Sequence, residues 1–197
     1  TILTLDQQKV LELFRDEKDL PGLFYLKHRL SEDLDFFTGA KDFPFVAVEE
    51  FVNKLSQNMS REARFQKVYD RYIFFLNSKA DEAGNELKIE FTKYPFPQLA
   101  EPQMFDRLRV DSLLDVAANK LMAMIDRFEP KDFVDLYFLL NKHFEMSEVV
   151  EAVNKKFGFK IEPITLGSEL TKAKRITFLP NMKLELSLDE LVGFFTK

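Results

Sequence analysis

The sequence predicts an α+β fold, in which a mixed sheet covered on one side by helices is followed by a helical half. Runs rich in β-branched and aromatic residues fall in the first half of the chain, whereas apolar residues recur at helical spacing in the second half. The change follows a cluster of prolines at Pro95, Pro97 and Pro102. We therefore expect an α/β region over residues 1–105 and a helical region over residues 106–197 that packs against it.

Each element of the first half follows from a local pattern. Thr4 is a suitable cap for a helix whose apolar residues follow at helical spacing. Residues 87–92 alternate between apolar and polar side chains, and the turn-forming run 81–85 separates them from an earlier apolar run, so we expect a hairpin. The expected elements are a helix from Leu5 to about Phe14, a strand over residues 34–37, a helix from Val46 to about Met59, and strands over residues 65–76 and 87–92.

Helices are expected throughout the second half. Apolar residues recur there at helical spacing, and Pro130 stands where the first turn of a helix tolerates proline. The expected helices run from Val110 to Phe128, from Lys131 to His143, near residues 147–157 and near residues 188–195.

The composition excludes several kinds of site. The chain has no cysteine, which excludes disulfides, thiolate metal sites and cysteine nucleophiles.

No apolar run reaches about 18 residues and the first residues lack the order typical of a signal peptide, so we expect a cytoplasmic protein with no membrane partner. The formal charge of −5 argues against nonspecific polyanion binding over the whole surface. The 22 phenylalanines, spread along the chain, indicate an aromatic core.

Asp33 and Asp35 form the sharpest candidate site. In a strand they project from one face, while Leu34 and Phe36 anchor the opposite face in the core. Adjacent carboxylates repel each other unless a cation lies between them, and hard oxygen ligands suit Mg²⁺. The alternative is a strand end whose acids are solvated, because an Asp-x-Asp pattern is frequent by chance.

Glu90 is a second candidate metal ligand. It lies between two core residues of the strand 87–92 and faces away from them. If that strand lies beside the acidic strand, three carboxylates converge in the way that metal-assisted phosphoryl or nucleotidyl transfer requires. The alternative is an exposed strand residue that pairs with Lys88 or Lys93.

Basic and acidic residues of the helical half form a third candidate group. Lys120 and Arg127 share a helix face, and both could bind phosphate, arginine through its planar fork and lysine as a point charge. The alternative is a solvated helix face. Asp132 and Asp135 suit the start of the next helix, whose free N–H groups favour acids, and the functional interpretation makes Asp135 a catalytic or lysine-orienting acid.

Taken together, three segments resemble the AbiEii/AbiGii-type toxin family of nucleotidyltransferases, within the DNA polymerase beta-like superfamily. Their order and spacing agree with the family over roughly residues 23–140. The segments are His28-Arg29-Leu30-Ser31-Glu32-Asp33-Leu34-Asp35-Phe36-Phe37, Asp115-Val116-Ala117-Ala118-Asn119-Lys120-Leu121, and Arg127 followed by Lys131-Asp132-Phe133-Val134-Asp135-Leu136-Tyr137.

The resemblance implies a nucleotidyltransferase-like sheet and an Mg²⁺-dependent enzyme. Such an enzyme moves a nucleoside monophosphate from an NTP to RNA or protein and is often the toxin partner of an antitoxin protein. The implied metal ligands are Asp33 and Asp35, with Glu90 as a third acid. The expected catalytic residues are Asp33, Asp35, Lys120 and Asp135, and the expected nucleotide-binding residues are Arg29, Ser31, Lys120 and Arg127.

The chain departs from the family pattern just before Arg29. The family carries a Gly-Gly-Thr or Gly-Ser loop there, whereas only Pro21-Gly22 precedes Leu23-Phe24-Tyr25-Leu26-Lys27-His28 in this sequence. Such a loop supplies N–H donors for nucleotide phosphates at a helix N-terminus. Either the loop is lost or a stretch is omitted at this junction. A true loss would favour a catalytically silent relative that binds a nucleotide or a partner protein, and a metal-dependent nuclease would use the same carboxylates without an NTP.

Overall fold

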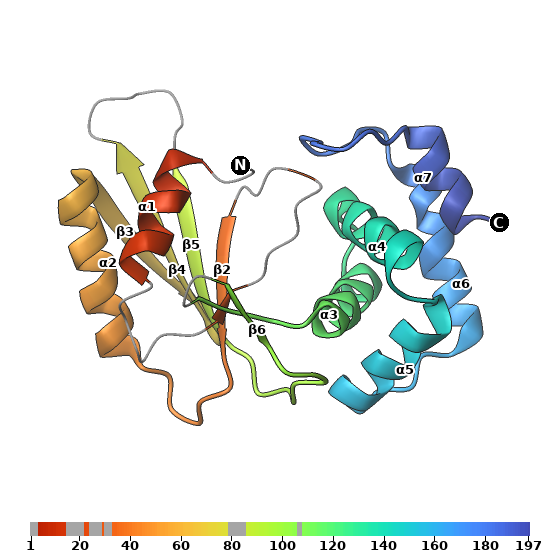
Figure 1. Ribbon diagram of the computed structural model, residues 1–197, viewed down its shortest axis with the longest axis horizontal. Coiled ribbons are helices and arrows are strands. Elements are labelled where there is room, and N and C mark those ends of the chain that lie inside the picture. The colour runs from red at the N-terminus through yellow and green to blue at the C-terminus, as the bar shows by residue number, and fades with distance from the viewer. Residues whose placement is uncertain (1–3, 15–21, 24–28, 30–32, 79–85, 106–107) are drawn as a thin grey trace. The chain divides into compact units, whose positions relative to one another are not determined.

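The chain forms two compact units in a computed structural model, which describes residues 4–14, 22–23, 29, 33–78, 86–105 and 108–197 (Figure 1). Unit 1 consists of Thr1–Tyr25, Ser31–Phe96 and Gln103–Val110. Unit 2 consists of Leu26–Leu30, Pro97–Pro102 and Asp111–Lys197. Two short segments from the first half of the chain therefore belong to unit 2, which is otherwise built from the second half.

Unit 1 is built on a mixed sheet. Its strands are β1 (Gly22–Leu23), β2 (Asp33–Thr38), β3 (Arg61–Val68), β4 (Arg71–Ser78), β5 (Leu87–Lys93), β6 (Gln103–Phe105) and β7 (Leu108–Val110). Within the described residues these seven strands pair in the order β3-β4-β5-β2-β1-β7-β6. The pairs β2–β5 and β1–β7 are parallel, and the remaining neighbours are antiparallel.

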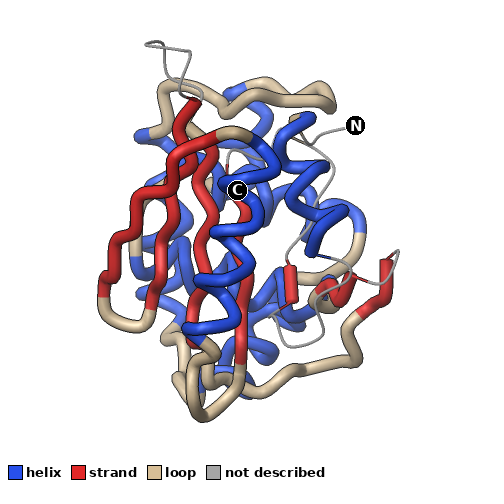
Figure 2. Tube along the Cα trace, turned by 90° about the vertical axis from the view of Figure 1, so that its left-hand side faces the viewer, coloured by secondary structure: helices blue, strands red, loops and turns tan. Residues whose placement is uncertain are grey.

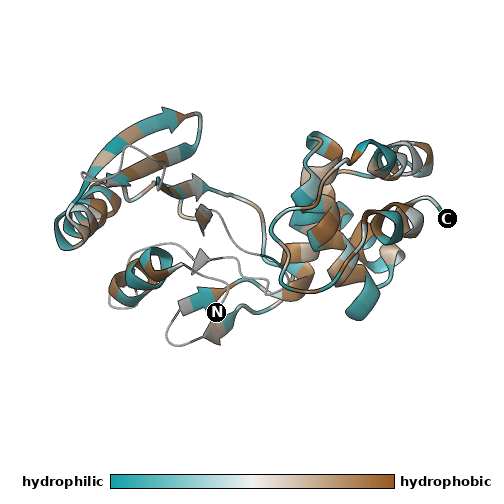
Figure 3. Cartoon of the chain, turned by 90° about the horizontal axis from the view of Figure 1, so that it is seen from above, coloured by the Kyte–Doolittle hydropathy of each residue, from teal (hydrophilic) through white to brown (hydrophobic). Residues whose placement is uncertain are grey.

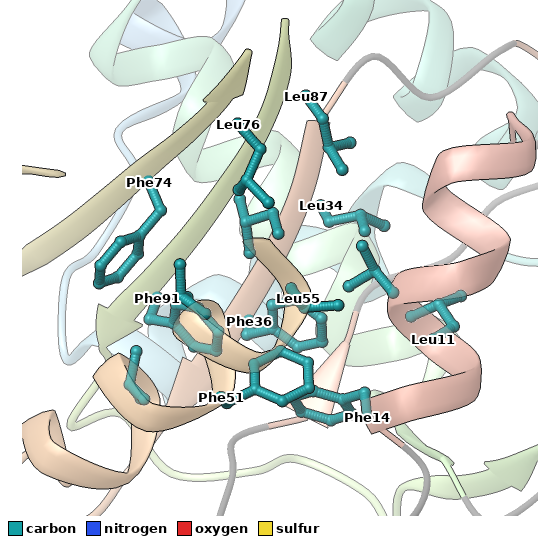
Figure 4. Packing of buried hydrophobic residues seen from close by; sticks show 14 residues of the cluster. Leu11, Phe14, Leu34, Phe36, Phe51, Leu55, Phe74, Leu76, Leu87 and Phe91 are labelled. Carbon is teal, nitrogen blue, oxygen red and sulfur yellow. The ribbon is translucent and has the colours of Figure 1, made fainter. Parts of the chain in front are cut away.

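One face of the sheet carries the core of unit 1. Helices α1 (Leu5–Phe14) and α2 (Phe45–Met59) pack against alternate residues of β2, β4 and β5, as expected from the period of two in a strand (Figure 4). The Phe36 ring is fully buried and stacks on Phe14 at 4.3 Å and on Phe91 at 5.0 Å between centroids. The predicted α+β class is confirmed. The buried sheet residues are Leu34, Phe36, Phe74, Leu76, Leu87, Ile89 and Phe91.

A hairpin replaces the single strand expected over residues 65–76. β3 and β4 pair antiparallel with Val68 opposite Arg71, and Tyr69 and Asp70 form the turn (Figure 2). Tyr69 has a φ of 52°, in the left-handed region that favours glycine. The expectation was wrong because no glycine, proline or asparagine marks this turn. The expected hairpin with residues 87–92 is confirmed, since β4 pairs antiparallel with β5.

Unit 2 is helical in its described residues. Its helices carry both hydrophobic and hydrophilic residues (Figure 3), and α4 is buried at eight consecutive positions. Helix α3 packs against both α4 and α5, and α7 packs against α4. The elements are α3 (Leu113–Asp126), α4 (Pro130–Lys142), α5 (Met146–Phe157), α6 (Pro163–Thr171), the 3₁₀-helix η1 (Lys172–Arg175) and α7 (Leu188–Phe195).

Helix α3 begins later than predicted. Ser112 caps it by accepting a hydrogen bond from the Asp115 N–H at 3.0 Å, and residues up to Val110 belong to strand β7. Helix α6 was not expected from the sequence, because it buries no residue and so lacks a strong apolar stripe. No helix in the described ranges is long and apolar enough to cross a membrane.

Candidate active site

Two of the predicted metal ligands lie side by side in the sheet of unit 1. β2 and β5 are parallel neighbours, and Asp35 is the register partner of Glu90. Register partners in neighbouring strands project from the same face, and Leu34 and Phe36 are buried on the opposite face. The acidic strand and the strand that carries Glu90 are therefore neighbours, which the expected convergence of the carboxylates required. Asp33 lies two residues earlier in β2, and its side chain is outside the described part of the structure.

Glu90 is buried and bound by two cations. Its Oε1 accepts a hydrogen bond from Arg71 Nε at 2.5 Å, and its Oε2 accepts one from Arg71 Nη2 at 2.8 Å. Lys88 Nζ lies 3.3 Å from Oε2, and Thr92 Oγ1 donates to Oε1 at 3.1 Å. Burial raises the pKa of Glu90, but the hydrogen bonds and charge of Arg71, with Lys88 and Thr92, outweigh it and lower the pKa overall. Glu90 therefore stays ionised with its charge compensated.

A second charged cluster lies in unit 2, around two buried aspartates at the start of α4. Arg29 makes a bidentate pair with Asp135, with Nε at 2.7 Å from Oδ1 and Nη2 at 2.9 Å from Oδ2. Lys120 Nζ lies 2.7 Å from Asp135 Oδ2 and 3.2 Å from Asp132 Oδ1. Arg127 Nε donates to Asp132 Oδ2 at 3.0 Å. Three cations thus converge on two aspartates.

The two aspartates set the charge state of Lys120. Burial lowers the pKa of this amine, but Asp135 and then Asp132 raise it more, so the net shift is upward. Lys120 is therefore an ammonium ion held from two sides. Asp135 orients it directly, which matches one of the two roles considered for Asp135 from the sequence. Asp132 does the same and also holds Arg127, a role that sequence reasoning did not assign to it.

A third cluster in unit 2 was not predicted at all. Asp115 is fully buried, and its Oδ1 lies 2.6 Å from the ammonium of Lys156, which is also buried. Oδ2 accepts from Ser112 Oγ at 2.6 Å, and the carboxylate also accepts from the N–H groups of Leu99 and Ala100. Asp115 therefore joins α3, α5 and residues 97–102. The one available signal was an acid within the apolar stretch of a predicted helix.

The sequence profile of the family described as "Nucleotidyl transferase AbiEii toxin, Type IV TA system" matches residues 22–193. The chain belongs to the AbiEii family. This confirms the resemblance inferred from the sequence. The match includes the segments that carry Asp35, Lys120 and Asp135.

A relative and two solved structures are similar to this AbiEii chain. An uncharacterized protein from Aquifex aeolicus is 32% identical over 136 residues, which are 66% of this chain and 59% of the relative. The alignment thus spans about three fifths of that relative's length. JHP933 from Helicobacter pylori has a TM-score of 0.60 at 21% identity, covering 98% of this chain and 88% of JHP933. The nucleotidyltransferase toxin MenT4 from Mycobacterium tuberculosis has a TM-score of 0.55 at 15% identity, covering 98% and 81%. Both structures share the fold of this chain, and the match to MenT4 supports a nucleotidyltransferase-like fold.

The sheet face of this AbiEii chain has a donor set suited to a divalent cation. Asp35 and Glu90 offer only hard carboxylate oxygens, and Asp33 belongs to β2, the strand that carries Asp35. Within the described side chains, no group of three or more His, Asp or Glu residues is arranged to hold a metal. Asp33 is not among these side chains. Glu90 pairs with Lys88, as its alternative interpretation required, but it is buried rather than exposed.

The remaining predicted residues whose structure is described all lie in unit 2. Arg29, Lys120, Arg127 and Asp135 belong to one cluster in unit 2, so the structure brings these four together. Ser31 lies outside the described residues, as do residues 24–28, which precede Arg29.

Proposed function

We propose that this AbiEii chain transfers a nucleoside monophosphate from an NTP to an RNA or protein acceptor, as the toxin of a toxin–antitoxin pair. The observation that carries the proposal is the register pairing of Asp35 with Glu90 on one face of the sheet. Family membership supports nucleotidyl transfer with a divalent metal and supports an antitoxin partner. We further propose RNA or protein as the acceptor and Mg²⁺ as the ion.

In this proposal the acids of unit 1 have two tasks. Asp33 and Asp35 would hold Mg²⁺, with Glu90 as the third acid once it is released from Arg71. Bound Mg²⁺ would supply positive charge that neutralises and orients the phosphates. One of the acids takes the proton of the attacking hydroxyl as its oxygen bonds to the α-phosphorus, and the bond from that phosphorus to pyrophosphate breaks.

From the family resemblance, we also propose that the cations around Asp132 and Asp135 bind nucleotide phosphates. Lys120 provides an ammonium that Asp132 and Asp135 hold in place, and Arg29 and Arg127 provide planar forks that match phosphate oxygens. Charge on the leaving pyrophosphate grows as the bond breaks, so oriented cations stabilise the transition state more than the ground state. Asp135 thereby acts as a positioning residue.

The proposal is tested by label transfer. Purified protein is incubated with Mg²⁺ and each α-labelled NTP, with bulk RNA and the protein itself as acceptors. We expect label in one acceptor, and its loss in Asp35→Ala. A matched control is Asp42→Ala, because Asp42 is an exposed acid in the loop between β2 and α2. Equal labelling by the parent and Asp35→Ala would contradict the mechanism, and release of fragments from RNA without NTP would indicate a nuclease.

A second candidate function is nucleotide or partner binding without catalysis. The observation that favours it is the sequence just before Arg29, which lacks the glycine-rich loop of the family. It predicts measurable NTP binding with no label transfer to any acceptor. Metal-dependent transfer that requires Asp35 would exclude it.

A further inference from the structure

The ion pair between Arg71 and Glu90 joins a fixed anion to a movable cation. Arg71 and Thr92 are register partners on the antiparallel strands β4 and β5, so Arg71 is a diagonal neighbour of Glu90 on the same face. Glu90 lies inside β5 with its side chain 8% exposed, whereas Arg71 is the first residue of β4, directly after a turn, with its side chain 46% exposed. The pair can therefore open by movement of Arg71 alone.

Glu90 stands between this cation and an acid. Arg71 reaches it from β4, and Asp35 is its register partner on β2. A metal ion bound at Asp35 and the guanidinium of Arg71 would thus compete for the same carboxylate from opposite sides. The metal ion can dissociate from the protein, whereas the guanidinium of Arg71 cannot. Whether Arg71 keeps Glu90 therefore depends on whether another group is present that can bind Arg71.

The acceptor positions of Glu90 are already filled. Two carboxylate oxygens offer about four acceptor positions. Arg71 Nε and Thr92 Oγ1 donate to Oε1, while Arg71 Nη2 donates to Oε2 and Lys88 Nζ approaches it. A metal ion can use Glu90 only if a donor withdraws, and Arg71 occupies both oxygens at once. Lys88 is less exposed than Arg71 and occupies a single oxygen.

We infer that Arg71 responds to substrate phosphate: it holds Glu90 while no nucleotide is bound and turns to a phosphate group when one arrives, which releases Glu90 to the metal. A guanidinium fork matches phosphate oxygens as well as carboxylate oxygens, and phosphate carries more charge. The inference rests on the proposed function, because it assumes that Asp35 holds metal and that an NTP is the substrate. Its consequence is that the third acid joins the metal site only when substrate is present.

A single variant, Arg71→Gln, should change the affinity for metal and the affinity for NTP in opposite directions. Arg71→Gln should bind Mn²⁺ alone about five- to tenfold more tightly than the parent does, because Glu90 loses the cation that occupies both of its oxygens and keeps only Lys88. A fluorescent NTP with Mg²⁺ should bind about tenfold more weakly, because a phosphate contact is lost. Free Mn²⁺ is measured by electron paramagnetic resonance and NTP binding by fluorescence anisotropy. A purely structural arginine would weaken both or change neither.

The matched control is Arg64→Gln. Arg64 lies on the same hairpin, but it pairs with Glu86 and lies over the Phe75 ring at 4.4 Å, away from Glu90. The Arg64→Gln variant removes the same charge as Arg71→Gln, so any general electrostatic effect on Mn²⁺ binding appears in both variants. The double variant Arg71→Gln/Glu90→Gln should lose the gain in Mn²⁺ affinity that Arg71→Gln shows. Equal Mn²⁺ affinity in Arg71→Gln and Arg64→Gln would overturn the inference.

The Asp35→Asn variant separates this inference from the proposed function. If Asp35→Asn binds Mn²⁺ as the parent does, the metal site itself is wrong and the proposed function fails with it. If Asp35→Asn loses Mn²⁺ while Arg71→Gln shows no change, the proposed function stands and only the role of Arg71 is refuted.

Discussion

Asp115 and Lys156 form an ion pair that is buried on both sides: Oδ1 and Nζ are 2.6 Å apart, and the side chains are 1% and 2% exposed. Ser112 and the N–H groups of Leu99 and Ala100 donate to the same carboxylate. A buried charge costs several kcal/mol unless every part of it is paired, and here the partners come from three segments of unit 2: residues 99–100, the start of α3, and α5. The pair is therefore a point at which removing one group affects several contacts.

Asp115→Asn should lower the free energy of unfolding by about 3–5 kcal/mol, because it leaves the ammonium of Lys156 buried without a counter-charge. Urea denaturation followed by circular dichroism measures the loss. The control is Glu162→Gln, since Glu162 pairs with Lys160 at 3.7 Å on the surface and should change stability by less than about 0.5 kcal/mol. Similar losses in the two variants would show that burial of the Asp115 pair has no special weight.

Stability should fall in acid, partly through this carboxylate. Burial raises the pKa of Asp115, but Lys156, Ser112 and the Leu99 N–H lower it by more than burial raises it. The folded pKa of Asp115 therefore lies below the ordinary value of 3.8. A carboxyl with a lowered folded pKa stabilises the protein above its unfolded pKa, and this stabilisation is lost as the pH falls through the folded pKa. Glu90 acts in the same direction from below its ordinary value of 4.5.

The resulting prediction is a loss of stability that begins below about pH 4.5 and steepens below about pH 3.8. Urea denaturation at a series of pH values measures it. Asp115→Asn should show a shallower loss in acid than the parent, because the asparagine does not titrate. Parallel curves for the two proteins would mean that Asp115 binds protons equally in its folded and unfolded states.

Under the proposed function, Lys120→Met should lower kcat/KM for label transfer by about 100-fold or more, because the ammonium assigned to the nucleotide phosphates is lost. Lys120→Arg should also lose activity, since a planar fork cannot occupy the position that Asp132 and Asp135 shape for a point charge. Lys155→Met, on the exposed side of α5, is the matched control. Full activity in Lys120→Arg would contradict the assigned geometry.

Phe36→Ala should destabilise the protein by about 3–5 kcal/mol, because its fully buried ring stacks on Phe14 and Phe91 and leaves a cavity when removed. Thermal unfolding measures the loss. Val46→Ala in α2, where the side chain is 66% exposed, should stay within about 0.5 kcal/mol of the parent. A small effect at Phe36 would indicate that α1 and α2 can collapse onto the vacant site.

Local patterns predicted the elements that have a clear period. Helix α1, strand β5 and helix α7 occur where the spacing of apolar residues placed them. The β3–β4 hairpin was missed because Asp70 is the single turn-forming residue of a turn in which Tyr69 has a left-handed φ, which usually belongs to glycine. One aspartate is a weak signal inside an otherwise strand-forming run, whereas the antiparallel register of β3 and β4 shows the turn directly.

For the candidate site, the division is similar. Side-chain alternation is a property of the strand backbone, so local pattern was enough to predict that Asp33 and Asp35 share one face. The folded chain was needed to show that Asp35 is the register partner of Glu90, that Arg71 binds Glu90, and that Asp115 binds Lys156. These contacts join residues far apart in the chain, and the partner of a buried charge is chosen by strand register and helix packing, which local spacing does not specify.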